Sequence, residues 1–137
     1  MKKIIAYFII VLFVFSCERK FEIFQFDCEN CYREKPEYGP IIIYFSIDEE
    51  NDSIQYTIYK GNFEERNVEY RDTAFYSEVQ IDVPVDKYYS IEAVYLNDTD
   101  TIYVVDGDKF NVRRETEQCD EKCYYFKDGI YDVRLME

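Results

Sequence analysis

The sequence predicts an all-β fold, an antiparallel sandwich of seven or eight strands. Short runs of β-branched and aromatic residues recur along the chain, and most alternate apolar with polar side chains, the period of a half-buried strand. Turn residues separate the runs, and the sequence has no sustained helical pattern. The 15 Tyr and 11 Phe favour pleated surfaces, and with 4 Gly and 3 Pro the chain is not of low complexity.

The first half of the chain is expected to hold four strands. Residues 41–47 form an uninterrupted β-branched and aromatic run of strand length. Residues 54–60 alternate cleanly and end at a glycine and an asparagine. Residues 68–71 form a weaker strand, which we expect at the edge of a sheet. Residues 78–83 alternate again and stop at Pro84, which cannot donate a ladder hydrogen bond.

The second half is expected to begin with a long hairpin. Residues 88–96 form the longest strand, and the polar turn 97–100 leads into a strand at 101–105. The sequence Asp106-Gly107-Asp108 is expected to break that strand. The remaining segments are a resumed strand at 109–113, a cysteine-bearing loop at 119–125 and a last strand at 130–136.

The first residues have the form of a secretory signal peptide. Two lysines begin it, an apolar core occupies residues 4–15, and the small Ser16 stands before Cys17. The core is short for a transmembrane helix, and a membrane anchor that is never cleaved is the alternative. The sequence Val14-Phe15-Ser16-Cys17 resembles the lipobox of bacterial lipoproteins, in which the cysteine is diacylated and becomes the new N-terminus.

This resemblance implies an anchored protein of the cell envelope. We expect residues 1–16 to be a cleaved signal peptide, Cys17 to carry the lipid, residues 17–38 to be a lipid-anchored tether and lead-in, and residues 39–137 to form the sandwich domain. Each buried CH₂ of an acyl chain contributes about 0.8 kcal/mol, so two or three chains hold a domain firmly at a membrane. The expected location is the outer membrane.

Charge and composition argue against several functions. The net charge of −13 comes from 16 Lys and Arg against 29 Asp and Glu, and it repels nucleic acid and anionic lipid headgroups. The chain has no histidine, so Ser-His-Asp and Cys-His catalysis are not possible. Carboxylates occur throughout, and nothing distinguishes a pair of them as catalytic. We therefore expect neither an enzyme nor a bound cofactor.

Four further cysteines form the pairs Cys28-x-x-Cys31 and Cys119-x-x-x-Cys123. An even number of cysteines in an exported small domain favours structural disulfides, and four cysteines allow three pairings. The short spacings would also suit a Cys₄ zinc site, and a redox-active Cys28-Cys31 pair is disfavoured by its acidic neighbours. We expect two disulfides where the two pairs meet, so that the first pair fastens the tether to the domain.

Two stretches give the chain a resemblance to a known group. The stretches VQIDVPVDKYYSIEAVYLNDTDTIYVVDGD and CDEKCYYFKDGIYDVRLM resemble small Bacteroidota lipoproteins with one Ig-like or fibronectin-III-like domain. The resemblance covers most of residues 28–137 and implies no enzymatic role. Val83-Pro84 and the pair Tyr88-Tyr89 resemble the E–F corner of such sandwiches, where a tyrosine opens the long strand and its hydroxyl bonds back to the corner. Either tyrosine could fill that position.

Two functions are consistent with this resemblance. One is a non-catalytic interaction or structural module that recognises a protein, and the other is a carbohydrate-binding accessory that uses exposed tyrosines. Three Asp-Ser/Thr-apolar sequences also resemble the sites at which Bacteroidota O-glycosylate exported proteins. Their acceptor residues would be Ser53, Thr73 and Thr101.

Overall fold

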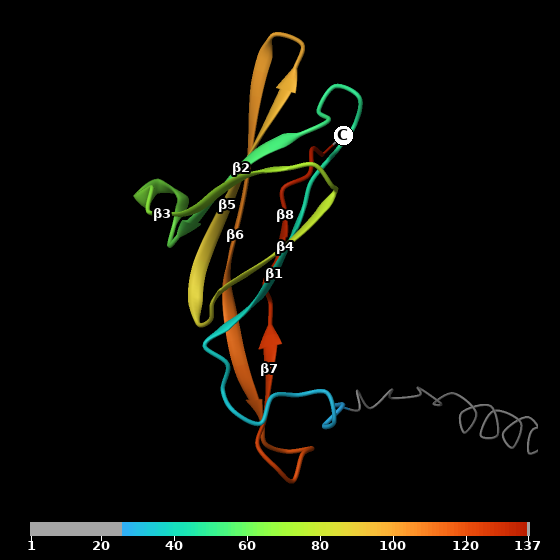
Figure 1. The fold of residues 1–137 in the computed structure, drawn as a ribbon. Coiled ribbons are helices and arrows are strands. Elements are labelled where there is room, and N and C mark those ends of the chain that lie inside the picture. The colour runs from blue at the N-terminus through green and yellow to red at the C-terminus, as the bar shows by residue number, and fades with distance from the viewer. Residues whose placement is uncertain (1–25, 137) are drawn as a thin grey trace, which may run out of the picture.

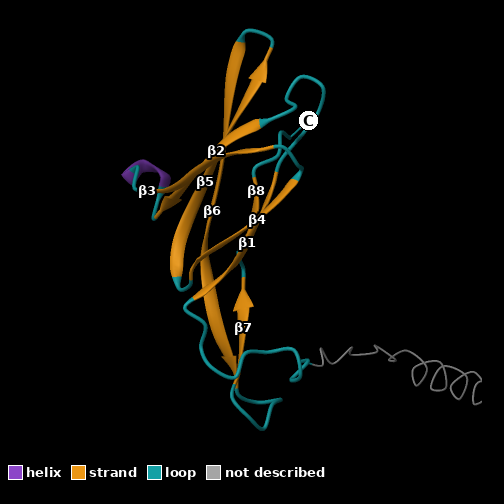
Figure 2. Cartoon of the chain, viewed as in Figure 1, coloured by secondary structure: helices purple, strands orange, loops and turns teal. Residues whose placement is uncertain are grey.

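The structure, a computed structural model, describes residues 26–136, which form two β-sheets packed face to face (Figures 1 and 2). A single turn of 3-10 helix, η1 (Phe63–Glu65), follows the second strand. The strands are β1 (Tyr38–Tyr44), β2 (Ile54–Lys60), β3 (Val68–Ala74), β4 (Glu78–Pro84), β5 (Lys87–Asn97), β6 (Asp100–Glu115), β7 (Cys123–Lys127) and β8 (Ile130–Asp132). One sheet has the order β4-β1-β8 and the other the order β3-β2-β5-β6-β7. The predicted all-β, sandwich-like architecture is confirmed.

One pairing departs from the predicted antiparallel arrangement. Strand β8 runs parallel to β1, with Ile42 opposite Ile130 and Tyr44 opposite Asp132. The last strand is also shorter than the predicted 130–136, because it ends at Asp132 and the chain continues without ladder pairing. Val133 is nevertheless fully buried, and its N–H donates to the Tyr44 carbonyl over 3.1 Å.

The predicted break at residues 106–108 is wrong, because β6 runs through it without interruption. Gly107 leaves room for a neighbouring side chain: a Cβ at this position would lie 2.8 Å from the Tyr88 hydroxyl oxygen and would displace the end of that side chain. The flanking carboxylates serve the strand as well. Asp106 accepts the N–H of Gly107 over 2.8 Å, and Asp108 accepts the N–H of Lys109 over 2.7 Å.

The segment 119–125 was predicted to be a loop, but its second part belongs to a strand. Residues from Cys123 onward form β7, which pairs antiparallel with the end of β6 from Asn111 to Glu115. The aromatic ring of Phe126 explains why this strand is held in place. It contacts the backbone of Gly39 and lies 5.4 Å, centroid to centroid, from the ring of Phe110.

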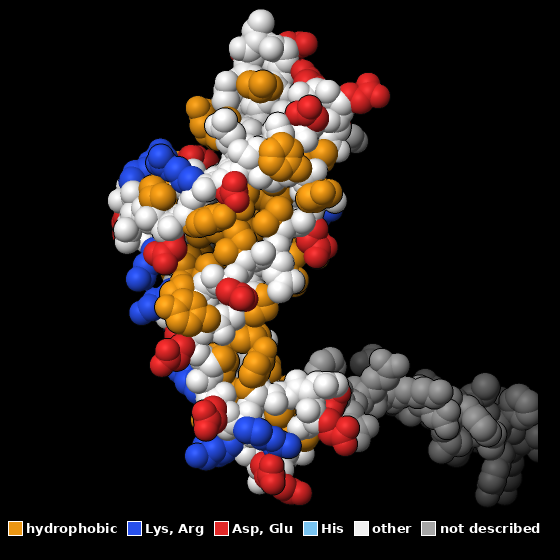
Figure 3. Space-filling view, in the orientation of Figure 1, with side chains coloured by type: hydrophobic (Ala, Val, Ile, Leu, Met, Phe, Trp, Pro, Cys, Tyr) orange, Lys and Arg blue, Asp and Glu red, His pale blue; other side chains and the backbone are white. Residues whose placement is uncertain are grey.

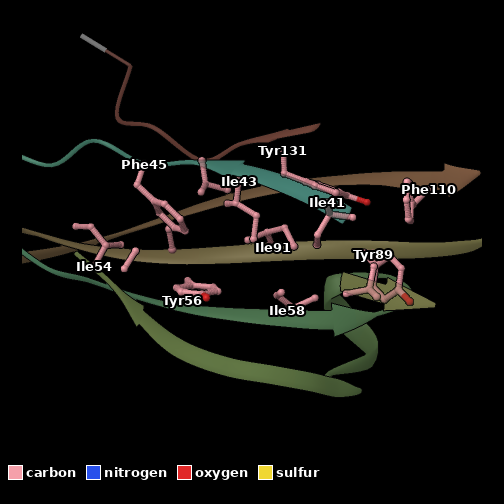
Figure 4. Close-up of a cluster of buried hydrophobic side chains, with 14 of the residues drawn as sticks. Ile41, Ile43, Phe45, Ile54, Tyr56, Ile58, Tyr89, Ile91, Phe110 and Tyr131 are labelled. Carbon is pink, nitrogen blue, oxygen red and sulfur yellow. The ribbon is translucent and has the colours of Figure 1, made fainter. Parts of the chain in front are cut away.

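The core lies between the two sheets and follows the alternation read from the sequence. Ile54, Tyr56 and Ile58 point inward from β2, and all three are buried. Figure 4 shows these side chains opposite those of Ile41 and Ile43 from β1. The other large buried side chains of this core include Phe45, Tyr89, Ile91, Tyr95, Phe110 and Tyr131.

The corner between β4 and β5 is closed by Tyr89. Its hydroxyl donates a hydrogen bond to the Pro84 carbonyl over 2.8 Å, and its side chain is fully buried. Tyr88 points to the opposite face of the sheet and is 40% exposed. Of the two candidate tyrosines, Tyr89 therefore occupies the corner position.

Replacing the corner tyrosine should lower stability measurably. We expect Tyr89→Phe to reduce the free energy of unfolding by about 1 kcal/mol, because the hydroxyl is lost and the half-buried Pro84 carbonyl loses its partner. Tyr88→Phe is the matched control and should change stability by less than about 0.5 kcal/mol. Urea unfolding of the two variants measures this difference, and equal losses would contradict the assignment of the corner to Tyr89.

Candidate functional site

The four cysteines meet at one end of the sandwich in two disulfides. Cys28 pairs with Cys119 and Cys31 pairs with Cys123, with Cα separations of 5.8 and 5.3 Å. The predicted disulfides are confirmed. Two of the three possible pairings would join the lead-in twice to the β6–β7 region, and the structure has the one in which the first cysteine of each pair is joined to the first of the other. A zinc site would need four thiolates, and this pairing leaves none. We refer to the two disulfides as the clasp.

Non-covalent contacts reinforce the clasp along the lead-in. Tyr32 and Tyr124 exchange two backbone hydrogen bonds, over 2.9 and 2.8 Å, so the lead-in makes a one-residue addition to β7. The Phe26 ring lies 4.9 Å from the Tyr125 ring, centroid to centroid. Arg33 pairs with the Glu121 carboxylate over 2.9 Å. The described part of the lead-in, residues 26–37, is thus fixed against the base of the domain.

A second ion pair joins the lead-in to the corner between β4 and β5. Lys35 contacts the Asp86 carboxylate over 2.6 Å, and Asp86 also accepts the N–H of Val112 over 3.0 Å. The hydrogen bond from Lys35 holds the pKa of Asp86 below its usual value. The pair is partly exposed, so its contribution to stability is small.

A cluster on the outer face of the five-stranded sheet was not predicted from the sequence. Glu92 points outward from β5 and yet is 8% exposed, because Arg66 and η1 cover it. Its carboxylate accepts the Tyr59 hydroxyl over 3.1 Å and lies 3.4 Å from the Arg66 guanidinium. The guanidinium lies 4.0 Å from the centre of the Phe63 ring. In these contacts the polar groups of the cluster pair with one another, and the cluster holds η1 on the sheet.

The exposed tyrosines are dispersed over the molecule. They belong to different elements, from the lead-in to the β5–β6 hairpin: Tyr32, Tyr38, Tyr70, Tyr76, Tyr88 and Tyr103. Among the described residues, no close ring pair joins two of them. Sugar-binding platforms place exposed rings side by side, so this arrangement gives the carbohydrate-binding alternative no support.

The three candidate glycosylation residues lie toward the end of the domain opposite the clasp. Ser53 and Thr101 are exposed, and Thr73 is half-buried on β3. Ser53 and Thr73 line a shallow hollow of about 300 Å³ together with Leu96, whose strand partner is Thr101. Neither the presence nor the absence of sugar follows from this geometry, so glycosylation stays a prediction.

This end of the domain, which we call the tip, consists of the β5–β6 turn and the loop 46–53. The turn extends beyond the rest of the sandwich, at the opposite end from the clasp (Figure 1). Asn51 ties the loop to the hairpin, since its side chain accepts the N–H of Leu96 over 2.8 Å and donates to the Leu96 carbonyl over 3.1 Å. The tip loop and residues 88–108 contain no Lys or Arg. In Figure 3, basic side chains gather beside β3 and near the clasp, whereas acidic ones reach the tip.

Other features bear on metals and membranes. Within residues 26–136, no group of three or more His, Cys, Asp or Glu side chains is arranged to hold a metal ion. The helical turn in the same residues is not long or apolar enough to cross a membrane. The predicted signal peptide and the predicted lipidation at Cys17 lie outside the described residues.

Comparison with protein-family models, curated proteins and solved structures finds no match to this chain. Function therefore has to be inferred from the geometry of the chain itself.

Proposed function

We propose that the chain is an exported lipoprotein, held at the outer membrane by acyl groups on Cys17, whose sandwich domain is a non-catalytic interaction module. The observation that carries this proposal is the clasp. Two disulfides join the lead-in, which follows the candidate lipid site in the sequence, to the base of the domain. Disulfides persist in exported proteins and are rare in the reducing cytoplasm.

The clasp also suggests an orientation at the membrane. Because Cys17 precedes the clasp by only a short stretch of chain, the lipid would hold the base of the domain near the bilayer. The tip would then point away from the membrane, where a partner can reach it. A covalent link between anchor segment and domain also keeps this orientation when the partner pulls on the tip.

The proposed domain type is an Ig-like or fibronectin-III-like sandwich. The order β3-β2-β5-β6 opposite β4-β1 supports it, because it is consistent with a Greek-key sandwich whose fourth and fifth strands lie in different sheets. The hydrogen bond from Tyr89 to the Pro84 carbonyl supports it further, because tyrosine corners occur at this position in such domains. Strand β8, parallel to β1, is a departure from that pattern.

Lipid attachment is the first test of the proposal. In cells fed a palmitate analogue, we expect the protein to be labelled and to fractionate with the outer membrane. The variant Cys17→Ala should lose the label, because the acyl groups have no acceptor. The variant Cys28→Ala is the control for a cysteine that is not lipidated, and it should keep the label. A label that survives Cys17→Ala would contradict the proposed anchor.

The interaction role is tested separately, with the full-length chain in detergent. On a glycan array we expect no binding, because the exposed tyrosines do not form a platform. Saturable binding to a glycan that is lost in Tyr103→Ala or Tyr88→Ala would contradict the proposed role and support the carbohydrate-binding alternative.

A further inference from the structure

Strand β6 is paired differently along its two halves. Its first part, from Asp100 to Phe110, pairs with β5, and its last part, from Asn111, pairs with β7. The N–H of Val112 donates to Asp86, in the turn that precedes β5. The backbone N–H and C=O groups of β6 therefore alternate in direction. Those of even-numbered residues point toward β5, and those of odd-numbered residues point to the side that β7 covers near the clasp.

The hairpin turn gives the same alternation independently. Asp98 and Thr99 form a two-residue turn, which makes Asn97 and Asp100 a hydrogen-bonded pair. Counting on from Asp100, residues 101, 103 and 105 direct their N–H and C=O groups away from β5. We call residues 101–105 the open edge.

Nothing in the described part of the chain covers the open edge. The N–H groups of Gly107 and Lys109, next along this side, are accepted by the carboxylates of Asp106 and Asp108. No side chain or loop among residues 26–136 reaches the N–H groups of Thr101, Tyr103 or Val105. Asp132 donates its N–H to Asp106, so the three-stranded sheet approaches β6 at the lower limit of the open edge.

The open edge also differs in composition from the other strand edges. Its sequence, Thr-Ile-Tyr-Val-Val, has no charge, glycine or proline and consists of strong strand formers. The other edge strands each contain charged residues: Glu69, Arg71 and Asp72 in β3, Glu78 and Asp82 in β4, Lys127 in β7, and Asp132 in β8. Charged residues protect an edge against pairing with another chain, and the open edge lacks this protection.

Side chains on both faces of the open edge would contact an added strand. Tyr103 and Val105 are 62% and 43% exposed on the outer face of the sheet. Ile102 and Val104 point inward, pack against the core and are only partly buried. An extended segment laid along β6 would therefore continue the five-stranded sheet and bury apolar surface on both sides.

The charges that flank the open edge identify the kind of partner. Asp98 and Asp100 precede it and Asp106 and Asp108 follow it. If a second copy of β6 paired antiparallel about Tyr103, Asp100 would face Asp106 and Asp98 would face Asp108 of that copy. Like charges opposite one another destabilise a strand pair, so a second copy is disfavoured. A segment with Lys or Arg at both ends would meet these carboxylates favourably.

We propose that the open edge binds an extended segment of another protein, with β-branched or other apolar residues at its centre and basic residues at both ends. The segment would add to the sheet as a strand, and its backbone would pair with Thr101, Tyr103 and Val105. This inference rests on the proposed role as an interaction module and names its binding surface. Lipid attachment is measured independently, so a failure of either can be recognised.

Peptide binding by the full-length, oxidised chain in detergent tests this surface. The probe is a fluorescent peptide of alternating valine and threonine with two lysines at each end. We expect saturable binding that weakens with added salt. Two comparison peptides should not bind: one with glutamate in place of lysine, and one N-methylated on alternate residues so that its backbone cannot pair. No saturable binding of the first peptide below about 1 mM would overturn the proposal.

Variants of Tyr103 locate the site. Tyr103→Pro removes an N–H that faces away from β5, so the hairpin should persist while peptide affinity falls about tenfold or more. Tyr103→Thr keeps the N–H and should weaken binding by less than about threefold. Unchanged affinity in Tyr103→Pro would overturn the proposal. The proposal would also be overturned if the wild-type chain self-associates and Tyr103→Pro abolishes the self-association, because the open edge would then bind a second copy of the chain. The N-methylated peptide tests backbone pairing with the wild-type protein. The proposal can therefore still be tested if Tyr103→Pro does not fold.

Discussion

Replacing all four cysteines of the clasp by alanine should lower the free energy of unfolding by about 7 kcal/mol. The disulfides join residues 91 and 92 positions apart, so either one closes nearly the whole domain into a loop. Closing such a loop stabilises the folded state by about 4–5 kcal/mol. With one disulfide in place, the other closes only a small ring between the two Cys pairs. Closing this ring adds about 2–3 kcal/mol to the free energy of unfolding.

The losses should therefore not be additive. Removing Cys28 and Cys119 together, or Cys31 and Cys123 together, should cost about 2–3 kcal/mol, since the remaining disulfide still closes the large loop. Removing all four should cost more than the sum of the two, and it would unfold a domain at the lower end of the usual 5–15 kcal/mol. Urea unfolding of the three variants measures this. A pair variant as unstable as the fourfold variant would contradict the shared loop.

Raising the pH above 10 should destabilise the domain strongly. Burial raises the pKa of Tyr89 to about 12 and raises the pKa values of Tyr56, Tyr95 and Tyr131 above their usual value of about 10. In the unfolded chain these hydroxyls lose their protons near pH 10, whereas in the folded domain they keep them. Stability is thus unaffected by these groups below about pH 9 and falls as the pH rises through about 10.

At about pH 11 each of Tyr56, Tyr89 and Tyr131 should cost about 1.4 kcal/mol, or about 4 kcal/mol for the three together, and Tyr95 should add a loss of the same sign. Urea unfolding between about pH 9 and pH 11 measures the slope, and the part of the tyrosinate absorbance that comes from the buried tyrosines should appear only on unfolding. Tyr131→Phe should reduce the pH dependence of the free energy of unfolding by about one proton. Stability that stays constant to about pH 11 would contradict the burial of these hydroxyls.

Periodicity predicted the parts of the fold in which one strand face is buried. Ile54, Tyr56 and Ile58 alternate with polar residues in the sequence, and the structure buries all three. The meeting of the two Cys pairs and a tyrosine at the β4–β5 corner were also predicted, but the choice of partner was not. Tyr89 rather than Tyr88 fills the corner because it lies on the inward face, in phase with Ile91.

The errors arose where long-range contacts override local signals. Asp106-Gly107-Asp108 has the composition of a turn, but the close approach of Tyr88 explains the glycine, and β6 continues through it. The parallel pairing of β8 depends on where the chain returns after β7, which no local pattern reports. The burial of Glu92, in β5, depends on Arg66, a residue that follows η1 between β2 and β3. In each case the deciding partner is distant in sequence.

The redox state of the four clasp cysteines in cells tests most directly whether the chain is an exported domain fastened to its lead-in. The chain isolated from membranes would be alkylated before any reduction, digested, and its cross-linked peptides identified by mass spectrometry. We expect Cys28 linked to Cys119 and Cys31 linked to Cys123, with none of the four alkylated. Four alkylated thiols, or a local bond between Cys28 and Cys31, would contradict an exported domain whose lead-in is fastened to its base.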